Sequence, residues 1–258
     1  KFGLGDSWVP MFVACSIIIS YNFIRYYELK LTQIELTSWY KEWFLKNIRW
    51  ISVLSITSSV GLIYILFSKG FNRDALWLLS PFIFMTVFYA IPLLKIRGKA
   101  ISFRSFPFVK IFAIAISWAA VSVLFPLYEA NFQFTNSVYL EFIQRFLLVV
   151  AITIPFDIRD VVVDSELLKT LPQVIGINGS RKLGSTLLFF VVILELFRVD
   201  IALEAIFLWV LVCLITALFL WGSTPKRSKY YTSFWVESIP IIWLILLILE
   251  SFILEIVS

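Results

Sequence analysis

Residues 201–221, IALEAIFLWVLVCLITALFLW, form an almost unbroken apolar run in which Glu204 is the single charged side chain. A helix that crosses the hydrocarbon core of a bilayer needs about 20 mostly apolar residues. The run therefore predicts a transmembrane helix. Other segments share this character, and the complete set of eight is residues 8–27, 48–67, 75–94, 106–127, 139–156, 183–198, 201–221 and 234–256.

The composition indicates that lipid surrounds most of the side chains. Hydrophobic residues make up 60% of the 258-residue chain, against about 45–50% in soluble domains. We therefore expect an all-α, polytopic transmembrane helical bundle of eight helices, organised as a single membrane domain over residues 1–258. The chain has no histidine, which removes the commonest general base and the commonest zinc ligand. Cys15 and Cys213 lie in apolar runs and are interpreted as small buried hydrophobic residues.

The distribution of charge predicts the orientation of these helices. Of the 22 Lys and Arg residues, 17 lie in or beside the loops that follow the odd-numbered segments, and four lie on the opposite side (Lys1, Lys69, Arg73 and Arg198). Basic loops face the cytoplasm, so the pattern predicts a multi-pass protein of the cytoplasmic membrane with its long loops, 28–47 and 157–182, inside. Cations held in short loops indicate topology, and no nucleic-acid partner is expected.

The residues with the richest chemistry follow the fifth segment, in Asp157-Ile-Arg-Asp-Val-Val-Val-Asp164. Asp157, Asp160 and Asp164 are spaced at i, i+3 and i+7, which places them on one face if the helix continues. Three like charges repel one another, and Mg²⁺, which prefers carboxylate and phosphate oxygens, would offset that repulsion. The pattern predicts a magnesium and phosphate site at the membrane surface. A solvated helix end with no ligand is an equally good interpretation of the spacing alone.

Several cations are candidates for binding the phosphate. Lys169 follows the aspartates, and Lys95, Arg104 and Lys110 lie around the connection between the third and fourth segments. Such cations would suit a diphosphate beside a carboxylate–metal cluster. The alternative is that they only orient the helices. Within the fifth segment Glu141 and Arg145 are spaced i, i+4 and are expected to form a structural pair. Glu195 and Glu204 are assigned no role.

The stretch from Asp157 to Asp164, followed by Lys169-Thr-Leu-Pro172 and Gly176, resembles the second aspartate-rich motif of the UbiA superfamily of intramembrane prenyltransferases. Residues 89–118 also resemble the connection between the fourth and fifth helices of that family. The likeness covers nearly the whole chain. It implies nine helices around a central cavity, of which the first would precede Lys1.

The resemblance implies that Asp157, Asp160 and Asp164 are metal-binding and catalytic residues, and that Mg²⁺ is the cofactor. Family members bind an isoprenyl diphosphate, lose diphosphate to form an allylic carbocation, and transfer the isoprenyl group to an aromatic or other lipophilic acceptor. In this chain the diphosphate would contact Asn22, Arg25, Lys95, Arg104 and Lys169. The expected partners are therefore the isoprenyl diphosphate, the acceptor and membrane lipid.

The first aspartate motif of the family departs from the pattern in this chain. Asn22 corresponds to the asparagine of the motif, but Phe23, Tyr26 and Lys30 stand where its aspartates are expected. Either Arg25 replaces one metal ion as a phosphate clamp, or the protein does not ionise a diphosphate in the usual way.

Three functions fit these residues. The first is a UbiA-type prenyltransferase with a divergent first motif, and the second is a non-catalytic relative that binds lipid or assists another membrane enzyme. The third is a small transporter, which is disfavoured because the segments lack the paired Gly/Pro-interrupted helices of a mid-membrane site.

Overall fold

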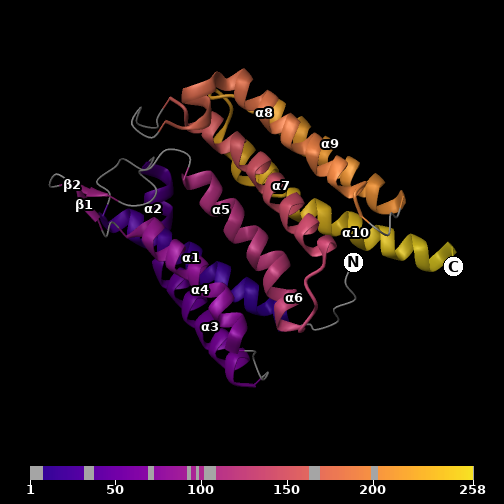
Figure 1. Ribbon diagram of the computed structural model, residues 1–258. Coiled ribbons are helices and arrows are strands. Elements are labelled where there is room, and N and C mark those ends of the chain that lie inside the picture. Colours follow the sequence, from indigo (N-terminus) through magenta and orange to yellow (C-terminus); the bar gives the residue numbers. More distant parts are fainter. Residues whose placement is uncertain are drawn as a thin grey trace. The chain divides into compact units, whose positions relative to one another are not determined.

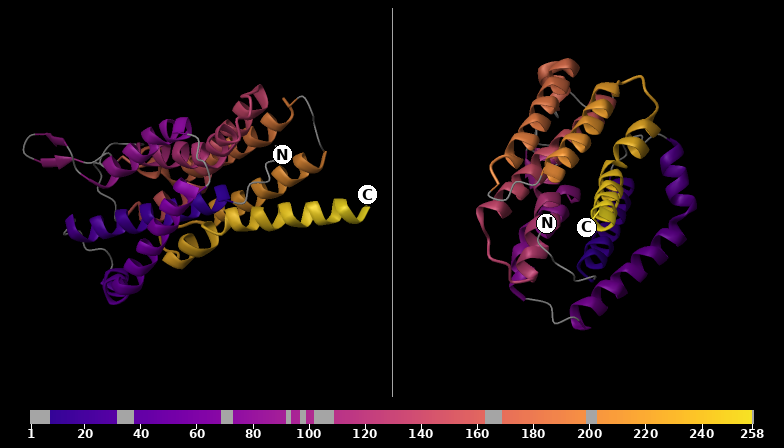
Figure 2. Two further views of the ribbon diagram at one scale, coloured as in Figure 1. Left: turned by 90° about the horizontal axis from the view of Figure 1, so that it is seen from below. Right: turned by 90° about the vertical axis from the view of Figure 1, so that its right-hand side faces the viewer.

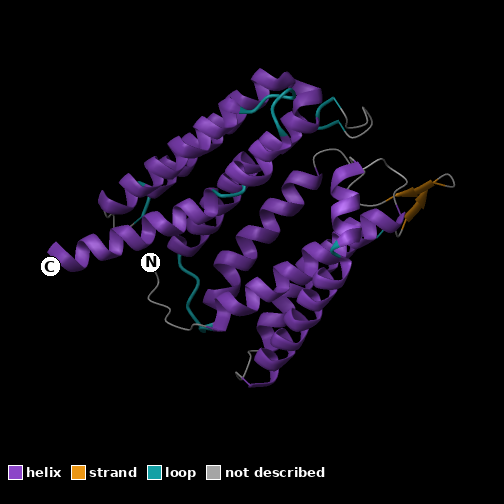
Figure 3. Cartoon of the chain, turned by 180° about the vertical axis from the view of Figure 1, so that it is seen from behind, coloured by secondary structure: helices purple, strands orange, loops and turns teal. Residues whose placement is uncertain are grey.

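The structure is a computed structural model, and it describes residues 8–31, 38–68, 73–91, 94–96, 99–101, 109–162, 169–198 and 203–257. Helices make up most of these residues, with one short antiparallel strand pair (Figures 1 and 3). The chain divides into two compact units, residues 1–104 with 125–133, and residues 105–124 with 134–258. The single domain over residues 1–258 stays a prediction.

The first unit contains helices α1 to α4 and the short helix α6. Their bounds are α1 Trp8–Leu31, α2 Ser38–Lys46, α3 Ile48–Ser68, α4 Arg73–Ala90 and α6 Phe125–Glu129. After α4, the strands β1 (Leu94–Ile96) and β2 (Lys99–Ile101) form an antiparallel pair. Helix α1 packs against α3 and α4, and its Phe12 ring lies 5.1 Å from the ring of Phe125.

The second unit is built around α7. Its elements are α5 Val109–Ala119, the π-helix η2 Ala120–Leu124, α7 Asn136–Asp160, α8 Leu171–Glu195, α9 Leu203–Gly222, the π-helix η4 Tyr231–Val236 and α10 Ile239–Val257. Helix α7 packs against α5, α8, α9 and η4, and α7, α8 and α9 run side by side (Figures 1 and 2). The core contains Leu148 of α7, Val191 of α8 and Trp209 of α9, whose indole lies 4.6 Å from that of Trp243.

Seven helices among the described residues are long and apolar enough to cross a membrane, which is consistent with an integral membrane protein. They are Trp8–Tyr27, Ile48–Ser68, Val109–Glu129, Asn136–Asp160, Leu171–Glu195, Leu203–Gly222 and Tyr231–Phe252. The remaining predicted segment, 75–94, coincides with α4, which has 18 residues and carries Arg73 and Asp74 in its first turn. At 1.5 Å per residue α4 is about 27 Å long, which is short for a bilayer core of about 30 Å.

Helices α1, α7 and α8 extend beyond the segments expected from the sequence. Helix α7 continues to Asp160, and α8 begins at Leu171 instead of residue 183, so much of the predicted 157–182 loop is helical. The start of α8 has its own local signals, because Pro172 lies in its first turn and the Thr170 N–H donates to Gln173 Oε1 at 2.9 Å. The predicted 28–47 loop likewise contains α2 and the end of α1.

The buried glycine of α8, Gly184, marks a close approach to the neighbouring helices. A Cβ atom there would lie 2.5 Å from a Leu220 methyl group and 3.1 Å from a methyl of Ile154, and both neighbours are fully buried. We expect Gly184→Ala to lower the free energy of unfolding by about 1–2 kcal/mol through overpacking. Gly61→Ala is the control, because its Cβ would meet only Cys15 Sγ, at 3.6 Å. Thermal unfolding in detergent should show a lower melting temperature for Gly184→Ala and an unchanged one for Gly61→Ala. Equal melting temperatures for the two variants would contradict this packing.

Candidate functional site

Asp157 lies in the last turn of α7, three residues or about 4.5 Å before the helix ends. Its side chain is 3% exposed, and Lys110 Nζ of α5 donates to its Oδ1 atom at 3.2 Å. The Lys110 side chain is 27% exposed, so the cation reaches the buried carboxylate from a more open position. A buried carboxylate without such a partner would be costly, which explains why the two residues pair.

Asp160 is the final residue of α7, one turn beyond Asp157, and it is paired with its neighbour. Arg159 donates from Nε and Nη2 to the two oxygens of Asp160, at 2.7 and 2.6 Å. Arg159 Nη1 also donates to Thr232 Oγ1 at 2.8 Å and to Ser233 Oγ at 3.4 Å. Because Thr232 and Ser233 belong to η4, Arg159 joins the acidic end of α7 to the segment before α10.

Asp157 and Asp160, the first two of the three predicted aspartates, lie one turn apart on α7. The helix ends at Asp160, and Val161 and Val162 form a turn. The run of β-branched valines is a local reason for this end, since such residues lose side-chain freedom in a helix. Asp164 lies outside the described residues. In the described part of the chain no group of three or more acidic or cysteine side chains is assembled for a metal.

The predicted phosphate ligands fall in both units. Lys169 is exposed directly before α8 and has a positive φ of 43°. Asn22 lies on α1, where its Nδ2 atom donates to Ser55 Oγ of α3 at 2.9 Å. The Arg25 guanidinium on the same helix is 5.9 Å from the centre of the Tyr21 ring.

The side chains of two other predicted ligands lie outside the described part of the structure. Lys95 is part of strand β1, but its side chain is outside the described part, as is the whole of Arg104. At the positions where the first motif departs from the family, the Phe23 ring lies 5.5 Å from that of Tyr27, and Tyr26 is exposed.

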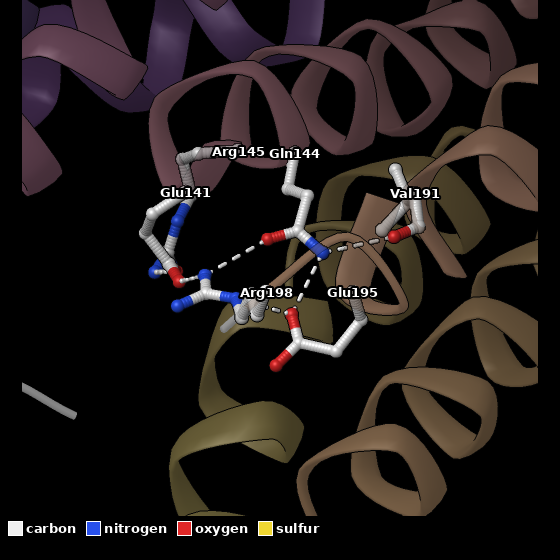
Figure 4. A network of polar contacts seen from close by, with 6 residues as sticks. All are labelled: Glu141, Gln144, Arg145, Val191, Glu195 and Arg198. Carbon is white, nitrogen blue, oxygen red and sulfur yellow. Dashed lines mark hydrogen bonds and ion pairs between the residues drawn. The ribbon is translucent and has the colours of Figure 1, made fainter. Parts of the chain in front are cut away.

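A buried polar network in the second unit was not predicted beyond its first pair (Figure 4). The expected Glu141–Arg145 pair is confirmed, with Arg145 Nη2 3.2 Å from Glu141 Oε1. Arg198 adds a second ion pair to Glu141 and donates from Nε to Glu195 Oε2 at 2.8 Å. Gln144 connects the pairs, because its Nε2 atom donates to Glu195 Oε2 at 2.9 Å and its Oε1 accepts from Arg198 at 3.1 Å.

The position of this network favours a structural role. Glu141 is five residues into α7, about 7.5 Å from its start, and Glu195 is the last residue of α8. Glu141 and Glu195 therefore lie near the ends of two packed helices. The Arg145 guanidinium lies 4.0 Å from the centre of the Trp243 ring, which ties α10 to the same cluster. The i, i+3 spacing of Glu195 and Arg198 is the sequence signal that could have predicted their ion pair.

Comparison of the chain with protein-family models, with curated proteins and with solved structures finds no match. The functional assignment therefore depends on the residues themselves and on the arrangement of the helices.

Proposed function

We propose that the protein is a UbiA-type intramembrane prenyltransferase. It would bind an isoprenyl diphosphate with Mg²⁺ and transfer the isoprenyl group to an aromatic or other lipophilic acceptor. The observation that supports this most is the buried Asp157 at the end of a helix long enough to span the membrane, with Asp160 one turn further on. A buried acid at this position is costly, and a metal–phosphate ligand gives it a function.

The donor set fits magnesium in part. Asp157 and Asp160 are hard oxygen donors spaced one helical turn apart, and Asp164, outside the described residues, would be the third. Asp157 Oδ1 and both Asp160 oxygens accept hydrogen bonds from Lys110 and Arg159, so these cations would have to leave the carboxylates. When bound, Mg²⁺ would neutralise the charge of the diphosphate.

The chain's own residues would bind and orient the donor. Lys110 and Arg159, once released from the carboxylates, would donate to phosphate oxygens, and Arg159 suits bidentate contacts. Lys169 would add a third cation. The apolar helices would enclose the isoprenyl tail and exclude water from the carbon that loses diphosphate. The acceptor supplies the electron pair for the new bond and releases a proton.

The basic loops support a site on the cytoplasmic face of the cytoplasmic membrane, by the positive-inside tendency. This orientation is part of the proposal. Cysteine accessibility to a membrane-impermeant maleimide, measured on cells carrying a Cys-free chain with Lys169→Cys, tests it. Labelling only after the membrane is permeabilised is expected, and labelling of intact cells would contradict it.

The reaction is tested by pyrophosphate release from the purified chain supplied with isoprenyl diphosphates of several lengths and a lipophilic acceptor. Release with Mg²⁺ that stops on addition of a chelator is expected. Binding of the donor without release, for every donor and acceptor tried, would reject the enzyme in favour of the second candidate.

The second candidate is a non-catalytic relative that binds an isoprenoid lipid. Two observations favour it. Asp160 has both oxygens engaged by Arg159, and Asn22, in the degenerate first motif, is bonded to Ser55. A protein of this kind would keep the apolar helices and bind an uncharged prenyl alcohol as tightly as the isoprenyl diphosphate. A competition measurement between the alcohol and the diphosphate distinguishes it from the enzyme, which should prefer the diphosphate.

A further inference from the structure

Where α8 bends, the second unit has an open pocket with a volume of about 440 Å³. Its lining comes from the first turns of α8 and from the connection after α9, and includes Ile175, Gly176, Gly179, Arg181, Thr224 and Pro225. The lining contains neither Asp157 nor Asp160. The pocket is therefore distinct from the candidate metal site.

The backbone of Gly176 shapes this pocket. Its φ of 73° and ψ of 164° are non-helical and interrupt α8, in a region of backbone space that is nearly exclusive to glycine. The helical segment after Gly176 has a new first turn, and the N–H groups of a first turn lack intrahelical partners. The pocket lining on this side, Ile177 to Gly179, is that first turn, and the positive end of the helix dipole lies there.

Arg181 contributes a guanidinium to the same pocket. Its Nη1 atom donates to Asn178 Oδ1 at 3.1 Å, and its Nη2 atom donates to the carbonyl of Ser223, just after α9. Its Nε atom is buried and has no hydrogen-bond partner within the described part of the chain. Arg181 therefore adds a positive charge to the pocket lining.

The charged side chains of the two segments that line the pocket are all positive. Residues 169–194 and 205–236, which contain the two sides of the pocket, have no Asp or Glu, and their cations are Lys169, Arg181, Lys182, Lys226, Arg227 and Lys229. All but Arg181 are exposed. No acid of these two segments competes for Arg181, so the field at the pocket favours an anion.

Aromatic side chains place the pocket at the level of a membrane surface. Trp221, Tyr230, Phe234 and Trp235 are about half exposed or more, and they lie at the end of α9 and in the segment leading into α10. Exposed Trp and Tyr mark the headgroup region of a bilayer. Pockets with basic side chains between membrane helices suit anionic lipid headgroups.

We propose that this pocket binds the phosphate of an anionic phospholipid. The Arg181 guanidinium and the first-turn N–H groups after Gly176 would contact the phosphate oxygens, while Lys226 and Lys229 would attract the anionic headgroup from the membrane. The acyl chains would lie along the apolar outer faces of α8 and α9. This site does not depend on the proposed prenyl transfer, because it shares no residue with the acidic end of α7.

The test compares lipid retention by the purified full chain in nanodiscs of phosphatidylcholine with or without phosphatidylglycerol, followed by native mass spectrometry. Wild type should retain phosphatidylglycerol selectively, and Arg181→Gln should reduce that retention about tenfold, as expected for loss of a charged hydrogen bond. Lys182→Gln is the matched control, because it removes the same charge from the next residue, which does not line the pocket. Equal losses in the two variants would overturn the proposal in favour of a diffuse positive surface.

A second variant guards against misfolding of Arg181→Gln. Thr224→Glu places a carboxylate at an exposed position in the pocket lining and leaves the Arg181 contacts intact, so it should also lose retention, whereas Ser228→Glu, which is exposed outside the lining, should not. Unchanged retention in Thr224→Glu would overturn the site. Inorganic phosphate is added in a separate arm, and if it displaces phosphatidylglycerol at millimolar concentration the ligand is a soluble phosphate and the lipid assignment is wrong.

Discussion

Replacing Arg198 with methionine is expected to lower the free energy of unfolding by about 3–5 kcal/mol, the range seen when one partner of a buried ion pair is removed. Arg198 is the shared partner of Glu141 and Glu195, whose side chains are 5% and 3% exposed. Its loss removes the Arg198 ion pairs of two buried carboxylates. Titration with denaturant in detergent, followed by Trp fluorescence, measures the change.

The double variant Arg198→Met with Glu195→Gln provides the control. Removing the buried Glu195 charge should recover part of the lost stability, because the neutral amide can still accept from Gln144 Nε2, which donates to Glu195 Oε2 at 2.9 Å in the wild type. Glu204→Gln, at an exposed position in the first turn of α9, should have little effect. A single Arg198→Met variant as stable as wild type would mean that the network of Figure 4 does not hold these helices.

The second large effect is expected for Asp157→Asn. If the acidic end of α7 binds a metal–diphosphate, loss of this carboxylate should slow pyrophosphate release by about 100-fold or more, since even outer partners of a metal site are worth 10–100-fold in affinity or activity. The asparagine keeps the size of the side chain and can still accept a hydrogen bond from Lys110. The measurement is the initial rate of pyrophosphate release with saturating Mg²⁺.

A matched acid distinguishes this effect from a general change of charge. Glu204→Gln removes one negative charge from the same unit at the start of α9 and should release pyrophosphate at the wild-type rate. Thermal unfolding without ligand is recorded for both variants, because Asp157 also stabilises Lys110. Wild-type release by a folded Asp157→Asn protein would exclude this residue from the site.

Long apolar segments were the part of the fold that could be predicted from sequence. The segments 48–67 and 201–221 agree with α3 and α9 to within two residues at each end, because a bilayer requires continuous apolar length. The start of α8 was missed because Asn178, Arg181 and Lys182 lower the local hydrophobicity. They are accommodated in the helix since α8 begins with a capped first turn and bends at Gly176.

The candidate site was predicted less completely, because its contacts join distant parts of the chain. Spacing identified Asp157 and Asp160, but their partners depend on tertiary structure, and Lys110 is 47 residues away from Asp157. The contact of Arg159 with η4 spans a still longer separation. The end of α7 at Asp160 was also missed, because the apolar run ends at Phe156 and the aspartates that follow it were assigned to a loop.

The proposed metal–diphosphate site at the acidic end of α7 is tested by binding of an isoprenyl diphosphate to the purified full chain. The dissociation constant is measured with Mg²⁺ and with a chelator, for wild type and for the double variant Asp160→Asn with Asp164→Asn. We expect Mg²⁺ to tighten binding to wild type at least about tenfold and to have no effect on binding to the variant. Equal affinity for all four combinations would contradict this site, and Asp160 and Asp164 would then have no part in binding the diphosphate.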